Sequence, residues 1–257
     1  MRTALYDRVI FGPIHSRRLG LSLGVNLLPL DHKLCSFDCI YCECGWGEKR
    51  EKVRFNDRET VRRELERKLT EMVEAGTPPN VITFAGNGEP TLHPDFGEII
   101  EDTIALRDRI APRAKVSVLS NATQIGRERV RAALLRVDNN ILKLDSAFDR
   151  TVRLVDRPRG NYSVAETVEN MKKFEGQLIV QTMFLRGEFD GKIVDNTTEE
   201  EVSAWLALIR EIAPRQVMVY TIDRSTPAEN LQKVTVEELK AIAARVEALG
   251  ITCSVAG

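Results

Sequence analysis

The chain has 257 residues, 43% of them hydrophobic and 29% charged, which is ordinary for a soluble globular protein and long enough for one large core. Its formal net charge is -1, so an overall basic field that would hold nucleic acid is excluded, although a local basic patch is not. The first seven residues lack the apolar run of a signal peptide, and no apolar stretch is long enough to span a bilayer, so we expect a cytoplasmic location.

Strand-like apolar segments alternate with amphipathic helical segments along the whole chain. Four helices are expected to begin at capping boxes, in which a Ser, Thr or Asn is followed three residues later by Glu. These pairs are Asn56 and Glu59, Ser163 and Glu166, Thr198 and Glu201, and Thr235 and Glu238. Two further helices are expected at 94–110 and 126–137, and strands at 21–28, 80–86, 115–121, 140–146, 178–185, 216–223 and 251–255.

This alternation predicts an α/β fold with parallel strands joined by right-handed crossovers. About six βα units form a partial (β/α)6 barrel, with a doubly wound open sheet as the alternative. We expect one domain over residues 1–257, with an extension at 1–20, the barrel core at 21–225 and a helix and short strand at 226–257. Binding loops are then expected at the carboxyl ends of the strands.

Three cysteines, Cys35, Cys39 and Cys42, lie within eight residues in a C-x3-C-x2-C spacing. A closed zinc site needs four ligands, whereas a 4Fe-4S cluster held by three thiolates keeps one iron free for a small molecule. Such close packing argues against a disulfide framework. The cysteines therefore indicate a cluster, or a zinc ion whose fourth ligand is Cys44 or His32.

Polar motifs follow three later strands. Residues 85–94 contain Gly88 and Glu89 directly after the second expected strand, where glycines allow close backbone approach and a carboxylate can accept hydrogen bonds from an ammonium group. Ser120 and Asn121 end the third strand, where they bind a ribose hydroxyl or cap a turn. Lys143 and Asp145 at the next strand end form a buried ion pair or face a substrate.

The cysteine spacing, with aromatic Tyr41 before the last cysteine, and the Gly-x-Gly-Glu-Pro segment resemble the radical S-adenosylmethionine (SAM) superfamily. The resemblance implies one 4Fe-4S cluster on Cys35, Cys39 and Cys42 whose free iron binds SAM. Reductive cleavage of SAM then gives a 5′-deoxyadenosyl radical that abstracts hydrogen from an unidentified substrate, with a flavodoxin or ferredoxin as electron donor. The implied SAM contacts are Asn87, Gly88 and Glu89 to the amino group, Ser120 and Asn121 to the ribose, Arg157 to the carboxylate and the Tyr41 backbone near the adenine.

Segments 11–29, 181–187 and 220–227 resemble a narrower subgroup, the small iron–sulfur oxidoreductases loosely related to wyosine-forming tRNA enzymes. An anionic small molecule is the expected substrate, without a membrane partner. Modification of a tRNA base, activation of a partner as a glycyl-radical enzyme, and a non-enzymatic zinc-binding module are the alternatives. Candidate substrate contacts are Arg17, Arg18, Lys143, Asp145, Arg186, Tyr220, Asp223 and Arg224.

Overall fold

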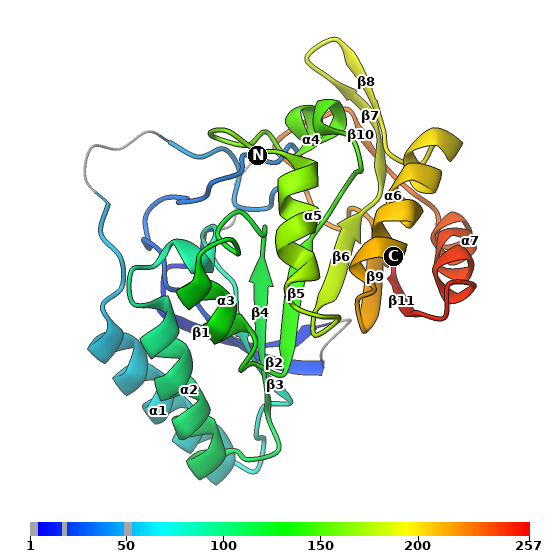
Figure 1. Ribbon diagram of the computed structural model, residues 1–257. Coiled ribbons are helices and arrows are strands. Elements are labelled where there is room, and N and C mark those ends of the chain that lie inside the picture. Colours follow the sequence, from blue (N-terminus) through cyan, green and yellow to red (C-terminus); the bar gives the residue numbers. More distant parts are fainter. Residues whose placement is uncertain (1–4, 17–19, 49–52) are drawn as a thin grey trace.

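A computed structural model describes residues 5–16, 20–48 and 53–257 (Figure 1). Its centre is an eight-stranded sheet in the order β1-β2-β3-β4-β5-β6-β9-β11, curled into a half-barrel. All neighbouring strands are parallel except the antiparallel pair β1 and β2. The partial-barrel prediction is therefore confirmed. The strands are β1 (Ile10–Ser16), β2 (Gly20–Val25), β3 (Val81–Phe84), β4 (Lys115–Ser120), β5 (Asn139–Lys143), β6 (Ile179–Met183), β9 (Gln216–Tyr220) and β11 (Thr252–Ala256).

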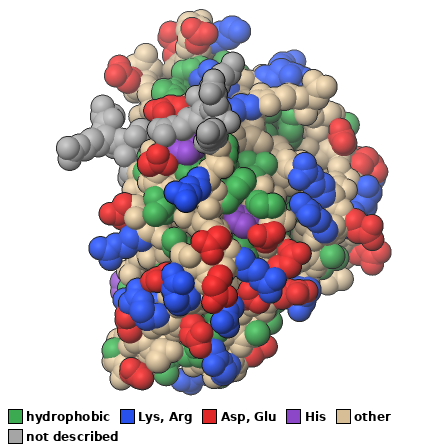
Figure 2. Space-filling model, turned by 90° about the vertical axis from the view of Figure 1, so that its left-hand side faces the viewer, with side chains coloured by type: hydrophobic (Ala, Val, Ile, Leu, Met, Phe, Trp, Pro, Cys, Tyr) green, Lys and Arg blue, Asp and Glu red, His purple; other side chains and the backbone are tan. Residues whose placement is uncertain are grey.

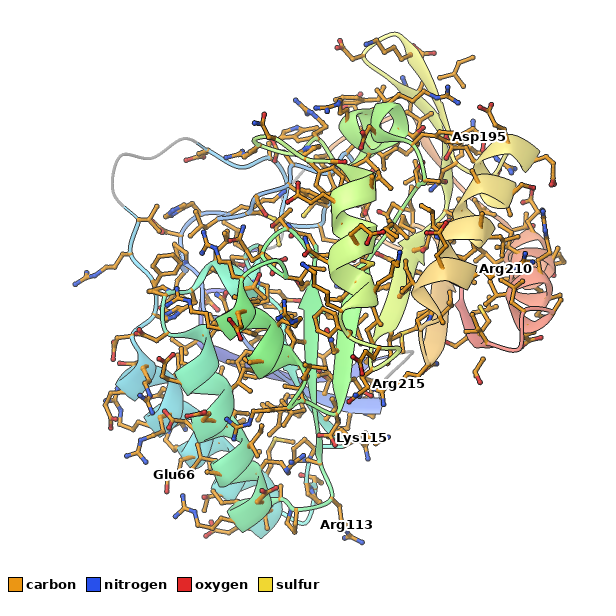
Figure 3. The ribbon with its side chains drawn as sticks, viewed as in Figure 1. Glu66, Arg113, Lys115, Asp195, Arg210 and Arg215 are labelled. Atoms are coloured by element: carbon orange, nitrogen blue, oxygen red, sulfur yellow. The ribbon has the colours of Figure 1, made fainter. Side chains whose placement is uncertain are left out.

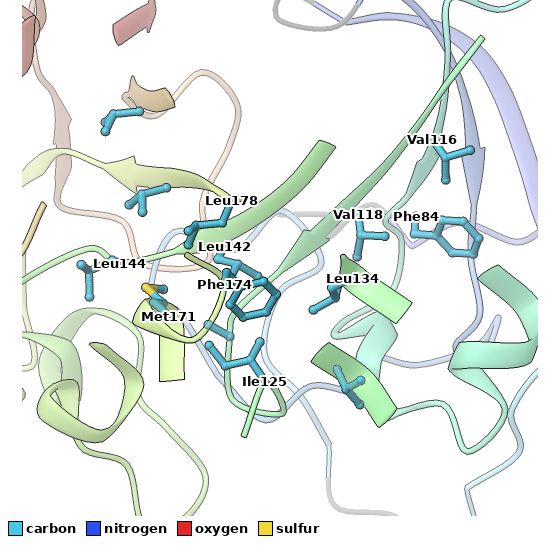
Figure 4. Close-up of a cluster of buried hydrophobic side chains, with 14 of the residues drawn as sticks. Phe84, Val116, Val118, Ile125, Leu134, Leu142, Leu144, Met171, Phe174 and Leu178 are labelled. Atoms are coloured by element: carbon cyan, nitrogen blue, oxygen red, sulfur yellow. The ribbon is translucent and has the colours of Figure 1, made fainter. Parts of the chain in front are cut away.

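Helices pack on the outer face of this sheet (Figure 1). Each presents an apolar stripe to strands that are buried on both faces, such as β3, in which every residue is buried. Figure 4 shows Phe84, Val118 and Leu142 of three strands beside Leu134 and Phe174 from the helical layer. The helices are α1 (Arg58–Glu74), α2 (Phe96–Ile110), α3 (Glu128–Leu134), α4 (Asp149–Val155), α5 (Val164–Lys172), α6 (Glu199–Ile212) and α7 (Val236–Glu247), with a 3-10 turn η1 (Pro90–Leu92).

Three of the four predicted helix caps are present. Ser163, Thr198 and Thr235 each accept a backbone N–H from the first turn of the helix that they start. A complete capping box forms at Thr235 and Glu238. At α6, by contrast, the carboxylate of Glu201 is buried and accepts hydrogen bonds from side-chain hydroxyls of other elements instead. The start of these helices is thus set by local sequence, as expected.

The predicted cap of α1 is wrong by one residue. Asp57, not Asn56, is the cap, and its carboxylate accepts the Thr60 N–H at 2.9 Å. The Asn56 side chain instead donates to the carbonyls of Asn26 and Leu28, at 2.9 and 2.8 Å. Both residue types cap helices well, and here the tertiary contact of Asn56 decides between them.

A second, three-stranded antiparallel sheet was not expected. Its order is β10-β7-β8, with β7 at Leu185–Phe189, β8 at Lys192–Asp195 and β10 at Leu231–Lys233. The β7–β8 hairpin turns at Asp190 and Gly191, both with positive φ, as a two-residue Asp-Gly turn requires. The expected strand at 178–185 is consequently divided, because β6 ends at Met183 and β7 begins at Leu185.

Charges on the surface are mixed. On the face shown in Figure 2, Lys and Arg side chains interleave with Asp and Glu, and neither sign covers a continuous area. Ion pairs form within and between neighbouring helices, such as Arg58 of α1 with Asp102 of α2 at 2.7 Å. In the part of the chain that the structure describes, no helix combines the length and apolar character needed to cross a lipid bilayer.

Candidate functional site

The cysteine loop begins shortly after β2 and is fixed against the loop that follows β3. The Leu34 N–H donates to the Asn87 carbonyl at 2.8 Å, and the Glu89 N–H donates to the Leu34 carbonyl at 3.1 Å. Gly88 lies between these bonds with φ +140°, and a Cβ added there would stand 1.8 Å from the Leu34 carbonyl oxygen. Only glycine therefore allows the two loops to approach so closely.

The other side of the cysteine loop is held by the segment after α4. The N–H groups of Asp38 and Ile40 donate to the carbonyls of Asp156 and Val155, each at 2.9 Å. In the reverse direction, the Arg159 N–H donates to the Ser36 carbonyl at 2.8 Å. The polypeptide alone thus holds the loop from both sides.

A cavity of about 320 Å³ opens on the concave side of this loop. Cys35, Cys39 and Cys42 all line it. The remaining wall comes largely from the carboxyl ends of parallel strands, where a barrel of this kind places its ligands. These residues include Gly86, Gly88, Glu89, Ser120, Asn121, Lys143, Gln181, Met183 and Tyr220.

The thiols in the cavity differ in acidity. Burial raises the pKa of Cys35 to about 12, and burial and the nearby Asp156 raise the pKa of Cys39 well above its ordinary value. A hydrogen bond from the Cys44 thiol, aided by the Lys33 ammonium group, lowers the pKa of Cys42 to about 6. These neighbours favour the thiolate form of Cys42, which is the form in which a cysteine binds metal.

Lys33 is buried under the loop that carries these thiols. Its ammonium group donates to the Gly45 carbonyl at 2.8 Å and to the Asp38 carboxylate at 3.3 Å. Burial by itself would lower the pKa of Lys33, but the surrounding thiols, Cys42 first, raise it. The residue thus supplies a fixed positive charge beside groups that bind metal as anions.

Glu89 is a fully buried carboxylate at the cavity wall. It accepts hydrogen bonds from the Thr91 N–H at 3.1 Å, the Ser120 hydroxyl at 2.9 Å and the Asn121 N–H at 2.6 Å. Burial raises its pKa, and these donors act against that rise. The donors fix the position of both oxygens, as a residue that orients a ligand group requires.

Asn121 links the end of β4 to the cysteine loop. Its side-chain amide donates to the Ser36 hydroxyl at 2.9 Å and approaches the Cys35 sulfur at 3.5 Å. Its own carbonyl oxygen accepts from Thr123 at 2.8 Å. Ser120 and Asn121 both line the cavity, and their proposed contact with a ribose stays a prediction.

Tyr41 connects the cysteine loop to a buried group of charges. Its hydroxyl donates to Asp145 and, at 3.2 Å, to Asp156, and it accepts a hydrogen bond from the Lys143 ammonium group. Lys143 and Asp145 form the ion pair that the sequence allowed, at 3.1 Å. Burial alone would lower the pKa of Lys143, but Asp145 raises it, so the lysine remains a cation. Asp156 also contacts the Cys39 sulfur at 3.3 Å, and burial followed by the Asp145 charge raises its pKa to about 8.

Two other predicted residues, Asn87 and Arg157, do not line the cavity. Asn87 is buried beside it and exchanges hydrogen bonds with the backbone of Tyr6, at 2.8 and 2.9 Å. The Arg157 guanidinium lies over the Trp46 ring and lines a different cavity on the outer side of the loop. Geometry therefore gives no support to a contact between Arg157 and the SAM carboxylate, which stays untested.

The expected cluster of substrate-binding arginines does not form among the described residues. Arg186 donates to Glu238 at 2.9 Å on the second sheet, and Arg224 pairs with Glu43 at 2.7 Å. Asp223 and Arg224 line a neighbouring cavity of about 390 Å³. Arg17 and Arg18 lie outside the described residues.

Some cavity residues were not singled out from the sequence. Lys33 stands two positions before Cys35, and this short separation in the chain was the only sequence feature that indicated a place near the thiols. Gln181 and Met183 occupy alternate positions of β6, so their shared face was readable once the concave side was known. Tyr6 also lines the cavity, as does Cys44, which the sequence offered as a zinc ligand. No sequence signal pointed to Tyr6.

The residues of the cavity fit a cluster with a bound amino acid derivative. Three thiols share its wall with a buried carboxylate, and the Gly88 backbone lines the same cavity. Within the described residues, no three His, Cys, Asp or Glu side chains are gathered closely enough to hold a single metal ion. A cluster, which takes one thiolate at each of three irons, needs no such convergence on a point.

Comparison with curated proteins gives relatives over nearly the whole chain. A protein of Methanocaldococcus jannaschii described as UPF0026 protein MJ1312 is 30% identical over 92% of this chain and 70% of its own length. A Brachyspira hyodysenteriae protein described as GTPase Obg is 29% identical over 93% of this chain. The chain spans only 33% of that second relative.

Solved structures share the fold. A radical SAM methyltransferase from Sphaerobacter thermophilus superposes with a TM-score of 0.68 at 15% identity, over 91% of this chain and 65% of the other. A structure of TYW1 with a lysine-pyruvate adduct gives 0.60 at 14% identity, over 88% and 73% of the two chains. At such identity the likeness concerns the fold alone.

The family model of the radical SAM superfamily matches residues 32–197, which include the cysteine loop and the ends of β3 to β6. This agrees with the resemblance seen in the cysteine spacing and in the segment around Glu89. The chain therefore belongs to the radical SAM superfamily of enzymes, whose cofactors are a 4Fe-4S cluster and SAM.

Proposed function

We propose that the chain is a radical SAM enzyme that acts on an unidentified substrate. Bound at Cys35, Cys39 and Cys42, the cluster and SAM would supply a 5′-deoxyadenosyl radical able to abstract a hydrogen atom. The observation that carries the proposal is the presence of three thiols and the buried carboxylate of Glu89 in one cavity. We also propose that residues 1–257 form a single domain. We place the protein in the cytoplasm, whose reducing conditions preserve thiolates.

In this proposal the two sides of the cavity have different tasks. Glu89 and the Gly88 backbone, after β3, bind and orient the amino group of SAM through charge-assisted hydrogen bonds. Lys143, Gln181 and Tyr220, from β5, β6 and β9, lie on the other side and contact the substrate. A substrate held there would lie against the cofactor, which keeps water from the reacting atoms.

Lys143 is the residue that we expect to meet an anionic group of the substrate. Its side chain is 17% exposed, whereas that of its partner Asp145 is 1% exposed, so only the ammonium end of the pair faces the cavity. Two donors of the ammonium group are directed to Tyr41 and Asp145, and Asp156 lies 3.9 Å away, beyond hydrogen-bond distance, so the third donor can meet a ligand. This assignment replaces the arginine cluster that the sequence suggested.

Modification of a tRNA base remains the second candidate function, on the resemblance of segments 11–29, 181–187 and 220–227 to proteins loosely related to wyosine-forming tRNA enzymes. A net charge of -1 and the mixed surface of Figure 2 do not favour it. Binding of tRNA that weakens steeply with salt would support this alternative. A glycyl-radical activase and a zinc module have no observation of their own in their favour.

The test is anaerobic reconstitution with iron, sulfide and SAM, followed by reduction with dithionite and detection of 5′-deoxyadenosine. We expect about four irons per chain, the content of one 4Fe-4S cluster, and 5′-deoxyadenosine that depends on SAM. A protein purified without oxygen that contains zinc but neither iron nor sulfide would refute the proposal and support the zinc module.

A further inference from the structure

Asn121 joins the two sides of the cavity. It follows β4, the strand that begins at Lys115 in the lower part of Figure 3. Its backbone N–H donates to Glu89 at 2.6 Å, whereas its side-chain amide donates to the Ser36 hydroxyl at 2.9 Å and to the Cys35 sulfur at 3.5 Å. The backbone of this buried residue therefore holds the carboxylate expected to orient SAM, and its side chain meets a cysteine expected to hold the cluster.

The direction of the Asn121 amide is fixed by Thr123. The N–H and the hydroxyl of Thr123 donate to the side-chain oxygen of Asn121, at 3.1 and 2.8 Å. A flipped amide would turn its NH2 group toward the Thr123 N–H, and two donors would then face each other. The oxygen is therefore on the Thr123 side, and the NH2 group faces the cysteine loop.

These bonds close into a ring of three side chains. The hydroxyl oxygens of Ser36 and Thr123 are 2.6 Å apart. Because the single hydroxyl proton of Thr123 goes to Asn121, the Ser36 hydroxyl donates to Thr123, and its own oxygen accepts from the Asn121 amide. Each polar atom of the ring thus has a partner within the protein.

The side chain of Asn121 has no polar group left for a ribose. A side-chain amide offers two donor hydrogens and two acceptor lone pairs. Its nitrogen has Ser36 and Cys35 as partners, and its oxygen accepts two bonds from Thr123. A contact between this side chain and a ribose would therefore require one of these bonds to break.

The Cys35 sulfur accepts from two N–H groups. One belongs to the Phe37 backbone, at 3.4 Å, and the other is the Asn121 amide. Hydrogen bonds to the cysteine sulfurs are among the factors that set the reduction potential of an iron–sulfur cluster. Of these two donors, only that of Asn121 can be removed by replacing a side chain.

We propose that Asn121 is a positioning residue that holds the Cys35 sulfur and, through this hydrogen bond, raises the reduction potential of the cluster. The inference rests on the proposed function, because it needs a 4Fe-4S cluster on Cys35. An N–H donor stabilises the additional negative charge that reduction places on the cluster and its sulfurs. The bond thereby makes the cluster easier to reduce by a low-potential carrier such as a flavodoxin or ferredoxin.

The test measures the midpoint potential of the reconstituted cluster without SAM, so that a contact with the ribose cannot contribute. Reduced cluster is followed by electron paramagnetic resonance while dithionite and mediator dyes set the potential. Asn121→Leu keeps the approximate shape of the side chain without an N–H, and Asn121→Ala is a second variant without a donor. Ser36→Ala is the matched control, because it removes a bond between Asn121 and the loop but leaves the donor to Cys35.

At the potential that reduces half of the wild-type cluster, both Asn121 variants should have a ratio of reduced to oxidised cluster about three- to tenfold lower, the size expected for one hydrogen bond. A tenfold change corresponds to about 59 mV for one electron. Ser36→Ala should match the wild type. The affinity of each oxidised protein for SAM, measured by equilibrium dialysis, should change little, since the backbone N–H that holds Glu89 is kept.

Unchanged potentials in the Asn121 variants would overturn the inference, and weaker SAM binding in those variants would then assign the side chain to SAM. An equal shift in Ser36→Ala would also overturn it, because the effect would then come from the loop as a whole. Loss of the cluster from both Asn121 variants would do the same, by showing a purely structural role. If the wild type assembles no 4Fe-4S cluster, the proposed function itself fails, and the inference with it.

Discussion

Replacement of Gly88 by alanine tests the contact between the cysteine loop and the loop that follows β3. The φ of +140° is strained for any residue with a side chain, at a cost of about 1–3 kcal/mol. The new Cβ would stand 1.8 Å from the Leu34 carbonyl, so the loops must separate and the two backbone hydrogen bonds of Leu34 must weaken. Losing both adds about 1–3 kcal/mol, which brings the expected total to about 2–6 kcal/mol.

The measurement is the urea unfolding midpoint of the metal-free protein, so that cluster content does not contribute. Gly191→Ala is the matched control, because Gly191 also has positive φ, at +68°, but has no atom within 4 Å of an added Cβ. We expect it to lose only the strain, about 1–2 kcal/mol. Gly88→Ala should also retain less iron after reconstitution. Equal midpoints for the two variants would refute the close-approach argument.

Three further predictions concern the site and one helix cap. Alanine at Cys35, Cys39 or Cys42 should abolish bound iron and sulfide, whereas Cys44→Ala should retain them; loss in Cys44→Ala alone would contradict the ligand assignment. Glu89→Gln should keep the cluster spectrum but weaken SAM binding, measured by equilibrium dialysis, since the amide binds an ammonium group less well than a carboxylate; unchanged affinity would remove Glu89 from the site. Hydrogen bonds from the N–H and hydroxyl of Thr235, and one from Arg186, lower the pKa of Glu238 to about 2. The ionised carboxylate of Glu238 therefore stabilises the fold above about pH 4.5. This contribution is lost as the pH falls towards 2. The urea midpoint of Glu238→Gln should therefore lie below that of the wild type at pH 6 and converge with it near pH 2; a constant difference would contradict this.

The parallel strands and most helix starts were predictable because each depends on a short stretch of sequence. Val81–Phe84 is apolar throughout, as a strand buried on both faces must be, and Thr235 with Glu238 carries its whole cap within four residues. The β7–β8 hairpin was missed because the run at 178–185 hides a strand boundary at Phe184. The Asp190-Gly191 pair is the sequence signal that marks this hairpin.

The arrangement of the site depends on contacts that sequence patterns do not contain. Tyr41 meets Asp145 across 104 positions of the chain. Arg157 has a positive φ of 50°, unusual for a residue with a side chain, and its guanidinium lies over Trp46 on the outer side of the loop. A motif fixes which residues are near in the chain, whereas the direction of a side chain follows from backbone angles that only the fold reveals.

The central sheet ends at two separate edge strands, β1 and β11, instead of closing on itself. A closed barrel surrounds its axis with strands on all sides, whereas a curved sheet with two free edges leaves one flank of that axis without strands. With Lys143 as the proposed substrate contact, only the reactive portion would have to reach that residue, and the rest could extend into solvent. The volume of the cysteine cavity therefore sets a limit on the reacting group and none on the size of the molecule that carries it.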